Sequence, residues 1–144
     1  MEQEKIDILA ETLLLEVITQ KVEMIEQLPI MLKGIDYLNG WAEVISKTTE
    51  CEIFESDAPS VMNFFTVGEK VLIELEMPCL ISTWQNREQL LRITTTVKAK
   101  CLVSHAEVFD WNNMNKIELL NHQKDVQFVE LNYIDTECDD IRAY

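Results

Sequence analysis

Cysteine and histidine are the residue types in this chain best suited to nucleophilic or metal chemistry. Cys101 and His105 lie four residues apart in a strand-like segment, so they share a face but stand about 13 Å apart along it. That distance excludes a direct thiolate–imidazole pair between them. A Cys–His pair assembled from different strands stays an alternative. His105 lies on the apolar side of its predicted strand, where we expect a hydrogen-bonded core residue.

The spacing of the cysteines argues against a zinc site. No Cys-x-x-Cys or Cys-x-x-His pair occurs among Cys51, Cys79, Cys101 and Cys138. The acidic N-terminus differs from the basic start of a signal peptide, and no apolar run reaches membrane-spanning length. We therefore expect a cytoplasmic protein without membrane insertion, whose reduced thiols pack in the core.

Catalytic motifs are not found. The chain contains no Gly-x-Gly-x-x-Gly, Walker loop, Gly-x-Ser-x-Gly or His-Glu-x-x-His pattern. Glu74 and Glu76 fall on the solvent side of a predicted strand, and the acidic residues at 135–140 lack the spacing of a calcium loop. We predict no enzyme activity, no catalytic residues, no metal and no cofactor.

The net charge of −14 comes from 26 acidic and 12 basic residues. Such a surface repels phosphate backbones and anionic membranes, which excludes nucleic acid as an expected partner. It favours a basic protein partner, although solubility alone would also account for an acidic surface.

The cysteines, histidines and carboxylates must be positioned by the secondary structure, which is predicted to be one long helix followed by strands. Residues 5–27 contain no Gly or Pro and repeat apolar residues at helical spacing, and Pro29 is expected to end the helix. Its broad apolar face is expected to dock on its own domain or, alternatively, on another subunit. The second arrangement would give a homo-oligomer. We therefore divide the chain into an N-terminal docking or oligomerisation helix, residues 1–27, and a β domain, residues 28–144.

The β domain is predicted to be antiparallel. Alternating or β-rich segments place the strands at residues 30–35, 41–48, 51–55, 70–77, 92–108 and 126–131. Residues 65–69 are expected to be a loop, and a further strand is possible at 117–120 in a polar segment. A short C-terminal helix would begin near Asp135 or Thr136. Six short antiparallel strands favour a small barrel or sandwich.

Two segments within residues 28–144 resemble the PilZ domain family. The first is 65–78, where Gly68 and an acidic residue precede a strand that ends near Pro78; the second is 125–131, with Phe128 and Leu131 leading toward a closing helix. Leu28-Pro29-Ile30 also resembles the start of the family's first strand. The resemblance implies a mainly β fold, a six-stranded antiparallel β-barrel with a short C-terminal helix, here preceded by the long N-terminal helix. It also implies binding of cyclic di-GMP.

The ligand motifs of that family are degenerate in this chain. The Arg-x-x-x-Arg motif, whose guanidinium groups clasp phosphates, has only Lys21 in its window at residues 19–25. In the Asp/Asn-x-Ser-x-x-Gly motif, Ser46, Thr48 and Cys51 replace the three specified residues. These four positions are the weak ligand-binding candidates. We expect a degenerate member of the family, without cyclic di-GMP binding, that recognises protein.

Aromatic residues with one arginine nearby are candidate interface anchors: Phe64, Phe65, Trp84, Arg87 and Trp111. The tryptophans would equally well cover the barrel ends. The resulting prediction is a non-catalytic, PilZ-like regulatory or adaptor protein of a bacterial cytoplasm that acts through protein–protein contacts. Its link to cyclic di-GMP signalling comes from the resemblance alone. The alternatives are a non-standard cyclic di-GMP receptor, using Lys21 with Arg87 or Arg92, and an acidic inhibitor or immunity-type protein that binds a basic target.

Overall fold

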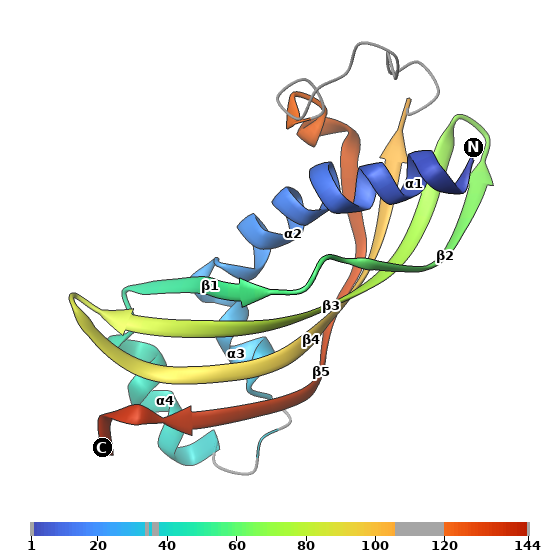
Figure 1. Ribbon diagram of the computed structural model, residues 1–144. Coiled ribbons are helices and arrows are strands. Elements are labelled where there is room, and N and C mark those ends of the chain that lie inside the picture. The colour runs from blue at the N-terminus through green and yellow to red at the C-terminus, as the bar shows by residue number, and fades with distance from the viewer. Residues whose placement is uncertain (1, 34, 36–37, 106–119, 144) are drawn as a thin grey trace. The chain divides into compact units, whose positions relative to one another are not determined.

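The computed structural model describes residues 2–33, 35, 38–105 and 120–143 (Figure 1). The helices are α1 (Gln3–Leu9), a π-helical stretch (Ala10–Leu14), α2 (Leu15–Val22), α3 (Leu28–Met31) and α4 (Leu38–Lys47). The strands are β1 (Glu50–Ser56), β2 (Ser60–Val67), β3 (Lys70–Gln85), β4 (Glu88–Ser104) and β5 (Val126–Asp140). Within the described residues, short 3-10 turns occupy Ile25–Gln27, Gln123–Asp125 and Ile141–Ala143.

The predicted N-terminal helix is confirmed over Gln3–Val22, and it ends before the expected residue 27. Most of its apolar side chains are buried, whereas Ile8 is exposed; the buried ones are Ile6, Leu9, Ala10, Leu13, Leu14, Ile18 and Val22. The π-helical stretch in its middle inserts extra backbone into the turn, and there Leu13 and Leu14 are both buried although they are adjacent in sequence. The helix therefore supplies core side chains to its own chain.

The chain forms two compact units. Unit 1 comprises Met1–Ile18, Ala58–Met77 and Lys98–Leu131, and unit 2 comprises Thr19–Asp57, Pro78–Val97 and Asn132–Tyr144. The strands β3, β4 and β5 contribute residues to both units.

Unit 1 is built on the pairing of β2 with β3. The two strands are antiparallel from Ser60 opposite Glu76 to Val67 opposite Lys70, and a two-residue turn joins them. The first turn residue, Gly68, has φ of +64°, a conformation that costs glycine little. The sheet residues of the unit 1 core are Val71, Ile73, Leu75, Met77, Ala99, Cys101 and Val103. Helix α1 packs against β2.

Unit 2 pairs β1 with β3, from Glu50 opposite Trp84 to Ser56 opposite Cys79. Its core contains residues of the short helices and of the sheet: Leu28, Met31, Leu32, Trp41, Val44, Cys51, Cys79, Ile81, Leu90, Leu91, Ile93 and Val97. Odd-numbered residues of β3 and β4 face this core, so most even-numbered residues face solvent.

Two predicted strands are helices instead. Residues 28–31 form α3 and residues 38–47 form α4, where strands were expected at 30–35 and 41–48. Pro29 lies in the first turn of α3, where a missing N–H is tolerated, so it begins a helix and does not end one. In and after α4 the buried residues Trp41, Val44 and Thr48 recur at i, i+3 and i+7, a helical period.

The expected six-stranded barrel is wrong. Over the described residues the sheet has five strands in the order β1-β3-β4-β5, with β2 also on β3, and it does not close. The mainly β, antiparallel class is confirmed. β3 and β4 each have one buried, largely apolar face and one more exposed, polar face. A barrel closed with the polar face inside would enclose carboxylates such as Glu74 and Glu76.

The C-terminal helix is also wrong, because residues 135–140 continue β5 and only a 3-10 turn follows. The half-buried residues Ile134, Thr136 and Cys138 alternate with exposed ones, which is the period of a strand. The expected loop at 65–69 is largely β2, and the strand that Pro78 was expected to close runs on to Gln85. Of the further strand expected at 117–120, residues 117–119 lie outside the described residues, and Leu120 is not in a strand.

His105 does not belong to the core. It follows the end of β4, is exposed, and has φ of +59°. Its backbone N–H donates to the carbonyl of Glu69 at 3.3 Å. The alternation of buried residues in β4 ends two residues before His105, at Val103.

A buried hydrogen bond in unit 2 gives a testable stability effect. The Tyr133 hydroxyl donates to Oε1 of Gln27 at 2.7 Å, and Gln27 is only 8% exposed. Tyr133→Phe leaves this buried oxygen unsatisfied, so we expect a loss of about 1–2 kcal/mol in the free energy of unfolding, measured by urea denaturation. In the matched double variant with Gln27→Leu, both partners are apolar and part of the loss should be recovered. A Tyr133→Phe variant as stable as the parent protein would contradict this assignment.

A candidate binding trough in unit 2

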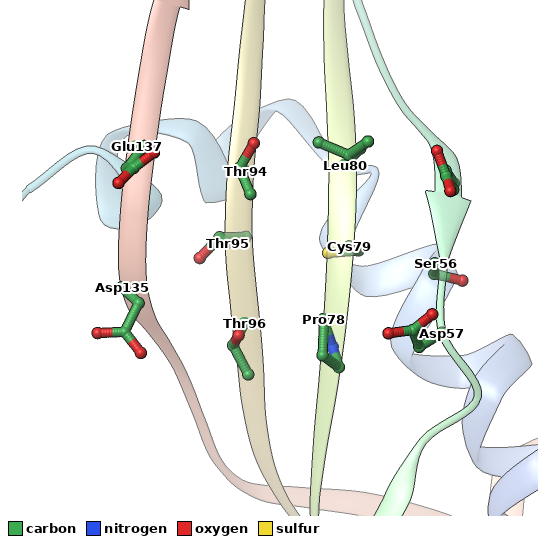
Figure 2. Close-up of a pocket in the computed structure, with 11 residues that line it drawn as sticks. Ser56, Asp57, Pro78, Cys79, Leu80, Thr94, Thr95, Thr96, Asp135 and Glu137 are labelled. Atoms are coloured by element: carbon green, nitrogen blue, oxygen red, sulfur yellow. The ribbon is translucent and has the colours of Figure 1, made fainter.

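The main candidate site is a cavity of about 340 Å³ on the solvent side of the unit 2 sheet (Figure 2). We call it the carboxylate trough. It is lined by Glu55, Ser56, Asp57, Pro78, Cys79, Leu80, Thr94, Thr95, Thr96, Asp135 and Glu137. Its residues come from β1 and the position after it, from β3, from β4 and from β5.

The floor of the trough follows from strand alternation. Odd-numbered residues of β3 and β4 are buried, so Pro78, Leu80, Thr94 and Thr96 lie on the other face. Pro78 has no N–H to donate, and its carbonyl accepts from the N–H of Asp57 at 3.0 Å. The proline is tolerated because its nitrogen lies on this same edge of β3, where the regular pairing with β1 ends at Cys79.

Four exposed carboxylates form the two walls. Asp135 and Glu137 stand two apart on β5, on the same side of the floor, and Asp57 stands across the floor from them (Figure 2). Glu55 is brought to the trough by a bulge in β1: the register shifts between Ile53 and Glu55, which sets Glu55 opposite Leu80. Without the shift, the strand alternation would point Glu55 to the core face.

The electrostatics of the trough are one-sided. Its lining includes no Lys, Arg or His, and none of the four carboxylates forms an ion pair within the part of the chain that the structure describes. Among the described residues, no group of three or more His, Cys, Asp or Glu is placed to hold a metal ion. The trough therefore presents negative charge and threonine hydroxyls to a ligand.

Two potential nucleophiles of the lining, the Cys79 thiol and the Thr95 hydroxyl, are held in inactive settings. Burial raises the pKa of the Cys79 thiol to about 11, so it is protonated at neutral pH. The Thr95 hydroxyl is buried and lies 2.8 Å from that of Thr136 and 3.3 Å from the carbonyl of Ile134. No base contacts either group in the described hydrogen bonds. The arrangement suits binding by charge and hydrogen bonds.

A second cavity of about 270 Å³ lies on the same sheet face of unit 2. It is lined by Glu52, Phe54, Ser82, Trp84, Gln89 and Arg92. The indole N–H of Trp84 donates to Oε1 of Glu52 at 3.1 Å, and the guanidinium carbon of Arg92 lies 6.0 Å from the centroid of the Phe54 ring. This cavity combines aromatic surface with both signs of charge.

The four degenerate-motif positions line neither cavity. Lys21 is in α2, and the Ser46 hydroxyl on α4 donates to the carbonyl of Glu43 at 2.6 Å. Thr48 is buried and donates to the carbonyl of Val44 at 2.9 Å. Cys51 is buried in β1, where desolvation and then the charge of Glu23 raise the pKa of its thiol to about 12. The hydroxyls and the thiol are thus engaged in local structure.

The candidate interface residues occupy different places. Phe64 is half-buried and Phe65 exposed on β2, whereas Trp84 lies within β3 and lines the second cavity. Arg87 is exposed in the two-residue turn between β3 and β4. Trp111 lies outside the described residues.

Sequence reasoning missed the trough. Thr94 and Thr96 alternate with the buried residues of β4, a strand that the sequence predicts. The alternation therefore places both threonines on the solvent face. Asp135 and Glu137 were interpreted as the start of a helix. Their alternation with Ile134, Thr136 and Cys138 was the available signal, and a strand over these residues would have placed both carboxylates on one face.

No family model matches the chain, and neither a curated protein nor a solved structure shows significant similarity to it. Among the described helices, none combines the length and the apolar character needed to cross a membrane. The resemblance to PilZ domains therefore stays a prediction.

Proposed function

We propose that this chain is a non-catalytic protein-binding module whose carboxylate trough receives the Lys or Arg side chains of a partner protein. The observation that carries the proposal is the pair of acidic walls around a hydroxyl-bearing floor, with no cation of the chain in the lining. A regulatory or adaptor role follows from binding without catalysis.

The charge and size of the trough select the ligand. A net charge of −14 attracts basic surfaces over distances near the Debye length, and the trough gives them a point of contact. Carboxylates facing each other across a floor can each accept charge-assisted hydrogen bonds from ammonium or guanidinium groups. The volume of about 340 Å³ is near the lower end for ligand pockets, about 300–1,000 Å³, and suits one or two side chains.

The same features disfavour a dianionic nucleotide. A cyclic dinucleotide would meet Glu55, Asp57, Asp135 and Glu137 without a compensating cation from the lining. The second cavity contains Arg92, but Glu52 lines it too. An acidic inhibitor of a basic target would use the chemistry proposed here, and it would differ only in blocking the activity of its target.

The test uses a fluorescently labelled octa-lysine peptide, with binding followed by fluorescence anisotropy at about 50 and 200 mM salt. The double variant Asp135→Asn/Glu137→Gln removes two charges from one wall with little change in shape. We expect it to weaken peptide binding at least tenfold at the lower salt concentration, and binding by the parent protein should fall as salt rises.

The matched control is Glu4→Gln/Glu11→Gln, which changes the net charge equally on the exposed side of the N-terminal helix. We expect less than a threefold change for this variant. Equal weakening by both double variants would show that binding reflects net charge alone, and the trough proposal would then be wrong. Calorimetric titration with cyclic di-GMP completes the test, because stoichiometric heat would favour the second-messenger receptor.

A further inference from the structure

The edge strands of the sheet differ sharply in charge. β2, with the sequence Ser-Val-Met-Asn-Phe-Phe-Thr-Val, carries no charged residue. β1 carries Glu50, Glu52 and Glu55. β5 carries Glu130, Asp135, Glu137, Asp139 and Asp140. In a chain of net charge −14, an uncharged edge strand of eight residues stands out.

β2 also lacks most of the features that protect sheet edges from pairing. Natural edges carry charges, prolines or bulges that block another strand. β2 has one bulge, between Val61 and Asn63, and beyond it residues 63–67 pair regularly with β3. Three of its apolar side chains are exposed: Met62 by 59%, Phe65 by 48% and Val67 by 57%. Within the described residues β2 pairs with no second strand.

The backbone of β2 is prepared for a neighbour on its outer side. The N–H of Phe64 donates to Oδ1 of Asn63 at 3.0 Å and so is not bonded to β3. Backbone groups alternate in direction along an antiparallel strand, so those of Phe64 and Thr66 both face away from β3. They form an outward-facing row with which a second extended strand can pair, its carbonyl replacing the Asn63 side chain as the acceptor of the Phe64 N–H.

We propose that this row pairs with β2 of a second copy of the chain, antiparallel, with Phe65 at the two-fold axis. Centring on Phe65 sets Phe64 of each copy opposite Thr66 of the other, so the outward-facing groups meet in both directions. The two Phe65 rings then form a cross-strand aromatic pair on one sheet face. A two-fold contact of this kind uses the same patch on both copies.

Charge identifies a second copy as the occupant. Two chains of −14 repel one another wherever carboxylates meet, and β2 is the described edge at which they approach without like charges opposed. A basic partner would gain nothing from an uncharged strand and would favour the carboxylate trough. The apolar side chains of the N-terminal helix are largely buried in its own chain, so the exposed apolar strand is the better dimer contact.

The first experiment measures the mass of the full chain by sedimentation velocity between about 1 and 100 µM. We expect a dimer, twice the chain mass of 16.8 kDa. Phe65→Lys, and separately Thr66→Pro, should raise the dimer dissociation constant at least a hundredfold; the proline removes an outward N–H that β3 does not use. The control Val129→Lys replaces an equally exposed apolar residue, at 54%, on the acidic strand β5 and should stay dimeric. Circular dichroism checks that each variant is folded.

A cross-linking measurement covers the case in which those variants do not fold. Phe65→Cys should form a covalent dimer under mild oxidation, because facing residues of an antiparallel pair bring their Cβ atoms to about 4.5–5.5 Å. Val129→Cys should not. A parent protein that stays monomeric to 100 µM would overturn the proposal. So would a dimer that survives both β2 substitutions, or equal cross-linking at the two cysteine positions.

Discussion

Between pH 7 and pH 10 we expect the free energy of unfolding to fall by about 4 kcal/mol. The largest part comes from three buried thiols, those of Cys51, Cys79 and Cys101. Burial raises their pKa values from 9.0 to about 12, 11 and 12, because a thiolate would lose its hydration in the core. The half-buried thiol of Cys138, whose pKa burial also raises, adds a smaller part that solvent screens. In the unfolded chain the same thiols ionise near their ordinary pKa.

The direction of the effect follows from which state releases protons first. Above pH 9 the unfolded chain loses its thiol protons while the folded protein keeps them, so rising pH favours unfolding. The stability contributed by these groups is complete below pH 9 and is lost as pH rises toward their folded pKa values. At pH 10 each of the three buried thiols accounts for roughly 1 kcal/mol or slightly more, and the three together for about 4 kcal/mol. Tyr133, whose pKa burial also raises, extends the loss at higher pH.

Urea denaturation at pH 7, 9 and 10 under reducing conditions measures this loss. The matched variant Cys51→Ala/Cys79→Ala/Cys101→Ala will be less stable at pH 7, because it leaves small cavities. Its stability should nevertheless change by less than about 2 kcal/mol between pH 7 and pH 10, because only Cys138 and Tyr133 keep pKa values that burial raises. A parent protein that loses under 1 kcal/mol over this interval would show that the thiols are not desolvated in the folded state.

Ile93→Ala is expected to lower the free energy of unfolding by about 3 kcal/mol at neutral pH. Ile93 is fully buried in the core of unit 2, on the face of β4 opposite the floor of the trough. The substitution removes apolar contacts and leaves a cavity that close-packed neighbours fill only in part.

Thr94→Ala is the matched control, because Thr94 is the next residue of β4 and is exposed. It should cost less than about 1 kcal/mol, chiefly through strand propensity. Urea denaturation of both variants compares the two faces of one strand. Equal losses would mean that the assignment of buried and solvent faces of β4 is wrong, and with it the floor of the trough.

Local sequence was sufficient for the elements with a strong apolar period. The helix at residues 3–22 and the strand character around Val71–Met77 and Ile93–Val103 follow from patterns of about 3.6 and 2 residues. These patterns are readable because burial constrains every second or every third to fourth residue. For the same reason, the alternation along β4 by itself places Thr94 and Thr96 on the face opposite the core.

Short apolar segments were not decided locally. Residues 28–31 and 38–47 contain enough apolar residues to fit a strand or a helix, and their packing in the unit 2 core selects the helix. Sheet closure likewise depends on long-range pairing. An alternating strand needs one covered face, and helices can supply that cover as well as a closed barrel can.

The trough was decided only by tertiary structure. Its acidic walls come from positions about 80 residues apart, and the register of β1, β3, β4 and β5 brings them to one cavity. Exposed carboxylates have no burial period, so Asp135 and Glu137 suited a helix start as well as a strand, and the bulge that turns Glu55 outward leaves no local signal. Net charge, the periods of the core-forming elements and the lack of known catalytic motifs can therefore be read directly from the amino-acid order. Strand register, a property of the whole sheet, determined which of the many carboxylates meet.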